Sequence, residues 1–129
     1  MNYDPIFDKW HEECGVFGVF DRTVDVARYV YWGLFALQHR GQESAGIAIT
    51  DGNEVALKKG MGLLTEAIKE LPTLKSHMGT GHVRYSTTGS NNPRNIQPLV
   101  IHYQGGQIAV AHNGNLTNAL GIRRQLEAD

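Results

Sequence analysis

The sequence predicts a fold of the α+β class, with antiparallel sheets and helices packed on their faces. Predicted strands come in clusters instead of alternating with helices along the chain. Two pairs of strands are separated by short turns rich in glycine, at residues 51–53 and 104–106, which are typical of hairpins. With 129 residues, the chain is long enough to enclose a hydrophobic core.

The first predicted elements are a strand over residues 16–20 and a helix over residues 26–38, with Asp25 as its N-cap. Apolar residues occur on nearly all sides of this helix, so we expect it to be covered on more than one side. Gly41 is expected to end the helix in the left-handed conformation that favours glycine.

The rest of the chain is predicted to contain five strands and two helices. The strands are expected at residues 44–50, 55–59, 79–85, 99–103 and 107–111. A short helix over 66–71 should stop at Pro72, and a last helix should run from Leu116 to the end. Residues 86–98 form a polar loop, and a loop of this length inside a compact domain is usually functional or mobile.

Composition and charge exclude several classes of protein. Twelve basic and thirteen acidic residues give a net charge of −1 without a basic run, so nucleic-acid binding is not expected. No apolar stretch reaches the roughly 18 residues of a membrane span, and residues 1–13 do not resemble a secretory signal. A single cysteine fits a reducing compartment, so we expect the cytoplasm. The histidines lack the spacing of a zinc site, and no metal site is predicted.

Cys14, the only cysteine, is the leading candidate for a nucleophile. A lone cysteine is more often a small buried hydrophobe, but here two acidic residues precede it and glycines flank it. Removal of residues 1–13 would make it N-terminal, and its α-amino group, with a pKa of about 7.7–8.0, could then act as the general base. Residues 1–13 are therefore interpreted as a leader, either a propeptide or a plain N-terminal arm.

Two further polar clusters contain arginines. Residues 38–46 lie between the first helix and a strand, and Arg40 there either has a role in a site or bonds the last carbonyls of the helix. In the strand near residues 81–85, His82 and Arg84 share one face. Arg84 could capture a carboxylate with two hydrogen bonds, or it could form a structural ion pair.

The last cluster is at residues 112–115. The side-chain amide of Asn113 and the backbone N–H of Gly114 could supply two converging donors for an oxyanion. The alternative is an ordinary Asn-Gly turn.

Four ordered motifs, at residues 14–18, 37–46, 81–87 and 111–116, resemble the class II glutamine amidotransferases, a group of N-terminal-nucleophile hydrolases. Gln-His-Arg-Gly-Gln and His-Asn-Gly-Asn-Leu are most similar to the amidophosphoribosyltransferase branch, because the branch that makes glucosamine-6-phosphate typically has Tyr-Arg-Gly-Tyr-Asp and His-Thr-Arg-Trp. The resemblance implies an αββα sandwich of antiparallel sheets between helices, present only as its N-terminal half. Residues 1–13 would be the propeptide and 14–129 a glutaminase domain that is incomplete at its C-terminus.

The same resemblance implies the roles of the reacting groups. Cys14 would be the nucleophile, exposed by cleavage of the Glu13–Cys14 bond, and Asn113 and the N–H of Gly114 would form the oxyanion hole.

The resemblance also implies a glutamine-binding set. Arg84 would bind the α-carboxylate of glutamine with help from the backbone around Thr87, Arg40 would order the site, and His82 is included among the substrate-binding residues. The aspartate that holds the α-amino group in the family lies beyond these motifs, so we expect little or no glutaminase activity from residues 1–129 alone.

At full length, the resemblance implies a homo-oligomer that passes ammonia from glutamine to phosphoribosyl pyrophosphate, making 5-phosphoribosylamine for purine synthesis. No cofactor is expected in this segment. Mg²⁺ would belong to the remainder, as would a 4Fe–4S cluster if the chain follows the cluster-bearing branch that its leader resembles. The alternatives are an inactive fragment, a glutamine-binding or interaction module without turnover, or a class II amidotransferase with a different acceptor.

Overall fold

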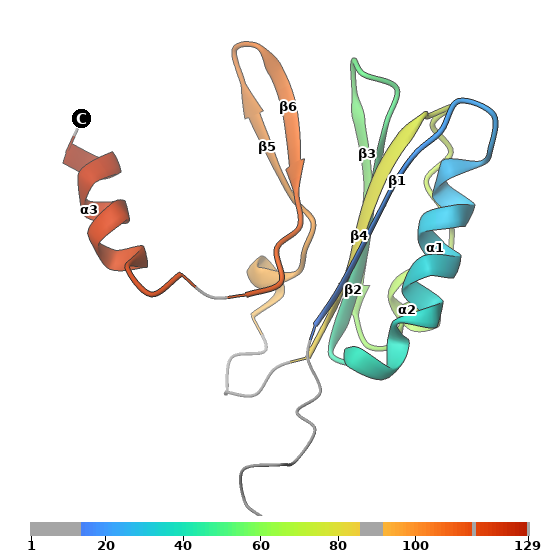
Figure 1. Ribbon diagram of the computed structural model, residues 1–129, viewed down its shortest axis with the longest axis horizontal. Helices are drawn as coiled ribbons and strands as arrows, with labels where there is room; N and C mark the ends of the chain where they lie inside the picture. Colours follow the sequence, from blue (N-terminus) through green and yellow to red (C-terminus); the bar gives the residue numbers. More distant parts are fainter. Residues whose placement is uncertain (1–13, 86–91, 115, 129) are drawn as a thin grey trace, which may run out of the picture.

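A computed structural model describes residues 14–85, 92–114 and 116–128 of the chain. Figure 1 shows four layers, which are helices α1 (Val26–Ala36) and α2 (Leu64–Ala67), a four-stranded sheet, a two-stranded sheet, and helix α3 (Ala119–Ala128). The strands are β1 (Gly15–Phe20), β2 (Ser44–Thr50), β3 (Val55–Met61), β4 (Met78–Arg84), β5 (Leu99–Tyr103) and β6 (Gly106–Val110). The predicted α+β class with antiparallel sheets is confirmed.

The four-stranded sheet has the order β1-β4-β2-β3, and every pair of neighbours is antiparallel. Its central strand β2 is buried along almost its whole length. Because Gly15 pairs with Val83, the preceding residue Cys14 lies beside Arg84, the last residue of β4, and Tyr85, which follows it. Sequence-distant motifs therefore meet at one end of this sheet.

The main core lies between α1 and the four-stranded sheet. Asp25 caps α1, as predicted, by accepting a hydrogen bond from the backbone N–H of Arg28. The helix packs directly on the backbone of β4, because Gly81 has no side chain. A Cβ atom added at Gly81 would lie 2.6 Å from Cδ1 of Leu34, which is fully buried.

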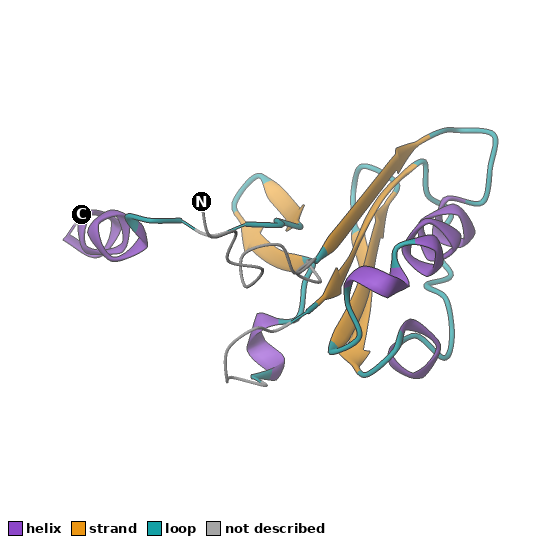
Figure 2. Ribbon diagram, turned by 60° about the horizontal axis from the view of Figure 1, so that its bottom comes forward, coloured by secondary structure: helices purple, strands orange, loops and turns teal. Residues whose placement is uncertain are grey.

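Two expectations for the first helix are wrong. Only one side of α1 is buried, and Tyr29, Trp32 and Phe35 are each more than half exposed, because the helix forms the outermost layer of the described structure (Figure 2). Gly41 is extended, with φ −157° and ψ 126°, and not left-handed. Glycine is needed there for a different reason, since a Cβ would lie 2.7 Å from the backbone of Arg84.

Both predicted hairpins are confirmed. Gly52 and Gly106 have φ values of +98° and +133°, which glycine adopts without steric cost. In the first turn, the carboxylate of Asp51 accepts hydrogen bonds from two following backbone N–H groups. Strand β3 continues two residues beyond its predicted end, because residues 60 and 61 still pair with β2.

The predicted bounds of the remaining helices differ from the structure. Helix α2 covers only Leu64–Ala67, so it begins two residues before the predicted range 66–71 and ends four residues before the end of that range. Helix α3 begins at Ala119, three residues later than expected. The described residues contain no helix that is long and apolar enough to cross a membrane.

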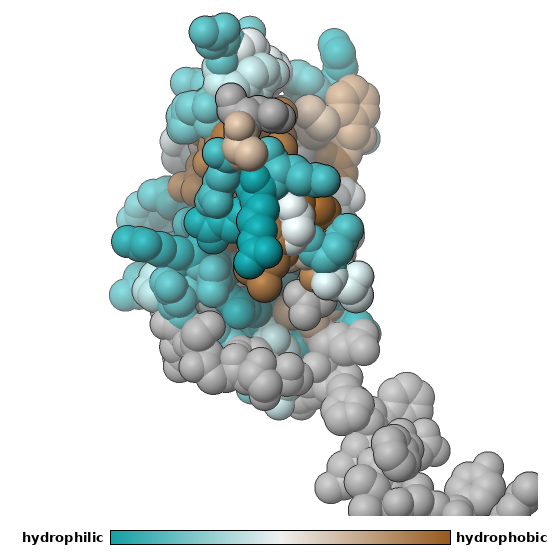
Figure 3. All heavy atoms as spheres, turned by 90° about the vertical axis from the view of Figure 1, so that its left-hand side faces the viewer, coloured by the Kyte–Doolittle hydropathy of each residue, from teal (hydrophilic) through white to brown (hydrophobic). Residues whose placement is uncertain are grey.

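The two-stranded sheet exposes an apolar face. Its side chains on one face remain between about two-fifths and just over half exposed; they are Leu99, Ile101, Tyr103, Ile108 and Val110. Helix α3 stands away from this sheet and has no buried residue, although Leu120 and Leu126 are apolar (Figures 1 and 2). Seen from the α3 side, apolar side chains are visible around and between polar ones (Figure 3).

Candidate active site

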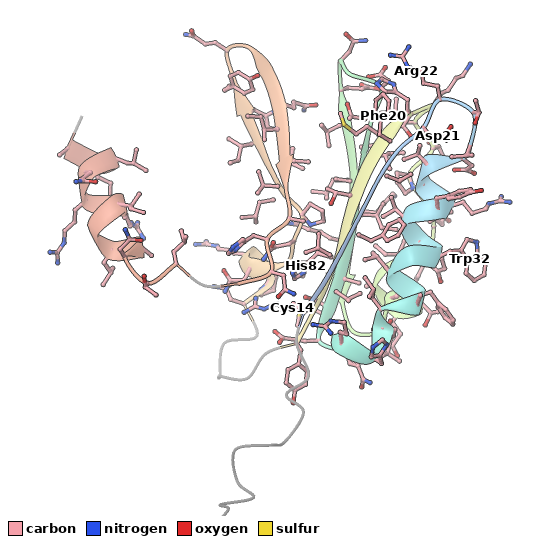
Figure 4. All side chains as sticks on the ribbon, in the orientation of Figure 1. Cys14, Phe20, Asp21, Arg22, Trp32 and His82 are labelled. Atoms are coloured by element: carbon pink, nitrogen blue, oxygen red, sulfur yellow. The ribbon has the colours of Figure 1, made fainter. Side chains whose placement is uncertain are left out.

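The candidate site is built around Cys14, which is partly exposed at the start of β1 (Figure 4). Its sulfur lies between two backbone groups of Tyr85. The thiol donates to the Tyr85 carbonyl oxygen at 3.5 Å, and the Tyr85 N–H donates to the sulfur at 3.4 Å. The rotamer of the candidate nucleophile is thus set by the end of β4.

The predicted cluster at residues 38–46 reaches Cys14 through Arg40, whose Nε donates to the Cys14 carbonyl oxygen at 3.3 Å. Gln38 fixes this segment, because its side-chain oxygen accepts from the N–H of Leu64 at 2.7 Å and its amide nitrogen donates to the carbonyl of Gly41. Gly41 then packs against the backbone of β4. The motif therefore joins the end of α1 to both β1 and β4.

Arg84 is half-buried at the end of β4, next to Cys14 in the sheet. Its backbone carbonyl accepts from the N–H of Glu43 at 2.9 Å. Within the part of the chain that the structure describes, its guanidinium has no carboxylate partner. The structural ion pair considered above is therefore not found among these residues, and the side chain can bind an anionic group of a ligand.

Asn113 and Gly114 follow β6, in the two-stranded sheet, and both are exposed. The Asn113 amide nitrogen donates to the Cys14 carbonyl oxygen at 2.5 Å, although the two residues are 99 positions apart. Gly114 has φ +154°, and a Cβ there would lie 3.2 Å from the ring of His112. One of the two predicted oxyanion donors, the Asn113 amide, thus lies beside the backbone of the candidate nucleophile and reaches it from the segment that follows β6.

His82 lies on β4 and is only 1% exposed. Burial lowers its pKa to about 4, and the charges of Arg84 and His112 act in the same direction, while the backbone of His112 opposes them. Among the residues that the structure describes, neither ring nitrogen has a partner that meets normal hydrogen-bond geometry, and the buried Ser44 hydroxyl has none either. Because its ring is buried, a role of His82 in substrate binding would act through its neighbours.

We expect His82 to make stability depend on pH. The folded-state pKa of about 4 is below the ordinary value of 6.5, so the unfolded chain binds more protons as pH falls from about 6.5 to about 4. Folding should therefore lose up to about 3 kcal/mol over this window. Urea unfolding at several pH values should show that the free energy of unfolding falls less between pH 6.5 and about pH 4 in His82→Gln than in wild type. The exposed control His39→Gln should keep the full loss, and an unchanged pH profile in His82→Gln would contradict the prediction.

Some predicted features cannot be placed. Glu13, on the other side of the proposed cleavage bond, and Thr87, whose backbone is predicted to help bind glutamine, lie outside the described residues. The parts of the chain that are described contain no group of three His, Cys, Asp or Glu side chains that could hold a metal ion.

The sequence reasoning missed two residues of this region. Tyr85 was part of a predicted motif, but its contacts with Cys14 use only backbone atoms, which no residue pattern reveals. Gln97 accepts a hydrogen bond from the backbone N–H of His112 at 2.6 Å, directly before Asn113. Its only sequence signal was its place in the long polar loop that was expected to be functional or mobile.

Comparison with known proteins identifies the family. The model of the class II glutamine amidotransferases matches residues 34–127, most of the chain. The chain belongs to this family. The amidophosphoribosyltransferase of Methanothermobacter thermautotrophicus is 45% identical over 122 residues, which are 92% of this chain and 26% of that protein. The one from Methanocaldococcus jannaschii is 50% identical over 117 residues, which are 88% of this chain and 25% of that protein.

Among solved structures, the glutamine phosphoribosylpyrophosphate amidotransferase from B. subtilis, complexed with ADP and GMP, matches with a TM-score of 0.78 and 45% identity. The match covers 88% of this chain and 24% of that one. The class II amidotransferase domain is thus confirmed by sequence and by fold. The chain spans about a quarter of the length of the relatives it matches.

Proposed function

We propose that this chain is the N-terminal part of the glutaminase domain of an amidophosphoribosyltransferase. The observation that carries the proposal is the convergence of Arg40, Tyr85 and Asn113 on Cys14 from three separate segments. The amino acids in their motifs and the amidophosphoribosyltransferase relatives support this branch over other class II enzymes. In the proposal, residues 1–13 are a propeptide and residues 14–129 begin the domain.

In the proposed reaction, Cys14 becomes N-terminal after the Glu13–Cys14 bond is cut. Its own α-amino group takes the thiol proton, and the sulfur attacks the side-chain carbonyl carbon of glutamine. Asn113 and the Gly114 N–H stabilise the negative oxygen that forms. Collapse of this intermediate breaks the carbon–nitrogen bond, and the protonated α-amino group returns its proton to the leaving nitrogen, which departs as ammonia. Water then hydrolyses the remaining thioester to glutamate and the free thiol of Cys14.

Substrate binding is assigned to residues around the end of β4. The Arg84 guanidinium binds the α-carboxylate of glutamine with two hydrogen bonds, and the backbone near Thr87 assists it. Arg40 orders the site through the Cys14 backbone, and His82 supports the position of Arg84 from within β4. The half-buried position of Arg84 and its lack of a carboxylate partner among the described residues support its assignment.

The other parts of the proposal concern the complete protein. Ammonia displaces pyrophosphate from phosphoribosyl pyrophosphate and gives 5-phosphoribosylamine, within a homo-oligomer in the cytoplasm. Mg²⁺, and a 4Fe–4S cluster in the branch that carries one, belong to the remaining three-quarters of the relatives' length. The exposed apolar face of β5–β6 and the unburied α3 support the view that further residues complete the second half of the sandwich.

An acceptor assay on the full-length protein tests this function. With glutamine as the nitrogen donor, we expect product only with phosphoribosyl pyrophosphate, and ammonia should replace glutamine. Turnover with fructose-6-phosphate but not with phosphoribosyl pyrophosphate would instead assign the chain to another class II amidotransferase. Glutamine binding without any turnover would support a binding module.

A second test uses residues 1–129 alone. We expect an intact mass that still includes residues 1–13 or shows only slow loss of them, and glutamate release at least about 10²-fold below that of the full-length protein. The physical reason is that the aspartate that the resemblance assigns to the α-amino group of glutamine lies outside these motifs, and the exposed Asn113 and Gly114 lack the cover that would exclude water from the oxyanion. Loss of one oxyanion donor already costs about 10²–10³ in kcat. Full-length rates of glutamine hydrolysis by this segment would contradict the prediction.

A further inference from the structure

The proposed site is divided between two sheets, so something must hold the two sheets in register. Cys14 directly precedes β1 and Arg84 ends β4, both in the four-stranded sheet, whereas Asn113 and Gly114 follow β6 of the two-stranded sheet. An oxyanion donor misplaced by about 1 Å can cost as much as 10²-fold in rate. The contacts that join the sheets near Asn113 therefore bear directly on catalysis.

Residues 96–98 provide such contacts, because they pack on the four-stranded sheet. Ile96 is only 4% exposed and Pro98 is fully buried. The ammonium group of Lys59, on β3, donates to the Ile96 carbonyl oxygen at 3.0 Å. A Cβ at Gly46, on β2, would overlap the carbonyl oxygen of Gln97, so the absence of a side chain there lets the two backbones meet.

The side chain of Gln97 connects residues 96–98 to the segment that contains Asn113 and Gly114. Its Oε1 accepts a hydrogen bond from the backbone N–H of His112 at 2.6 Å. The assignment of the oxygen follows from chemistry, since the partner is an N–H donor and only the oxygen of the amide can accept. One residue later, the Asn113 amide reaches the Cys14 carbonyl oxygen.

We propose that Gln97 is a positioning residue that fixes Asn113 and Gly114 relative to Cys14. Its backbone rests on β2 at Gly46, and its side chain holds the peptide N–H immediately before Asn113. The inference rests on the proposed glutaminase function. It assigns to Gln97 no contact with glutamine, so its substitution should change the alignment of the oxyanion donors and leave the affinity for glutamine intact.

Two substitutions in the full-length protein separate this role from simple packing. Gln97→Met keeps the length of the side chain but cannot accept a comparable hydrogen bond, whereas Gln97→Glu keeps an acceptor oxygen. We expect Gln97→Met to lower kcat for glutamine hydrolysis about tenfold or more, with the KM for glutamine within about twofold. Gln97→Glu should stay within about threefold of wild type, and ammonia-dependent turnover should be unchanged in both.

Two further readouts distinguish positioning from a structural effect. Hydrogen exchange of the His112 amide should be faster in Gln97→Met than in wild type. In Gln97→Glu it should stay as slow as in wild type. The kcat losses of Gln97→Met and Asn113→Ala should also be less than multiplicative in the double variant, because both act on one oxyanion donor.

Equal loss of kcat in both Gln97 variants, an unchanged kcat in Gln97→Met, or multiplicative losses in the double variant would overturn the proposal. If the wild-type protein does not hydrolyse glutamine, the proposed function fails. The exchange rate of the His112 amide then decides alone whether Gln97 fixes this segment, and equal rates in wild type and Gln97→Met would overturn it.

Discussion

Replacement of Cys14 by alanine in the full-length protein should reduce glutamine-dependent synthesis of 5-phosphoribosylamine by roughly 10³-fold or more. The thiol is the only cysteine sulfur in the 129 residues, and it lies against the backbone of Tyr85 with Arg40 and Asn113 on the adjoining carbonyl. No other nucleophile in this cluster could form the proposed thioester. Ammonia-dependent synthesis should persist, because it bypasses glutamine hydrolysis.

The comparison of the two nitrogen donors is the control within this experiment. A variant that simply unfolds would lose both activities, and Cys14→Ala should lose only one. Cys14→Ser gives a closer steric match and should behave in the same way. If glutamine-dependent synthesis were unchanged in Cys14→Ser, or if only ammonia-dependent synthesis were lost, Cys14 would not be the nucleophile.

Intact mass measured on the same samples tests the formation of the nucleophile. Wild-type full-length protein should begin at Cys14, and Cys14→Ala should retain residues 1–13, because the thiol is proposed to cut its own preceding bond. Processing that continues without the thiol would assign the cleavage to another protease and leave the glutaminase mechanism unaffected.

Local rules were enough to predict most of the strands. Hairpin turns depend on a few residues with special backbone preferences, and Gly52 and Gly106 have the positive φ values that such turns use. The cap of α1 is equally local, because Asp25 needs only the N–H three residues later. The motifs around Arg40 and Asn113 were also predicted as polar clusters, and the structure brings both to Cys14.

Contacts between distant segments were beyond a single sequence. Glycine at position 41 fits the pattern of a helix end, but the structure requires glycine there because the backbone of β4 lies too close for a side chain. Both situations favour the same residue, so the sequence alone could not distinguish them. Gln97 stood in a polar loop, and its role depends on Gly46, 51 positions away on β2, and on His112, 15 positions away after the end of β6. The outer face of α1 shows the same limit, since aromatic residues fit a buried helix equally well.

Asn113→Ala should lower kcat for glutamine hydrolysis by about 10²–10³ and leave the KM for glutamine within a few-fold. An oxyanion donor acts only when negative charge develops on the substrate oxygen, so its loss weakens the transition state more than the bound substrate. Steady-state kinetics with the full-length protein measures both parameters. Asn53→Ala, in the exposed turn between β2 and β3, removes the same amide away from the site and should match wild type.

The hydrogen bond from Asn113 to the Cys14 carbonyl oxygen offers a competing explanation, in which the amide only holds the backbone of β1. That role would lower the melting temperature and loosen Cys14, and it would affect glutamine binding and turnover together. The oxyanion role predicts a loss confined to kcat at an unchanged melting temperature. A rise in the KM for glutamine with a normal kcat would therefore remove Asn113 from the oxyanion hole, and Gly114 would be left as its only donor in this segment.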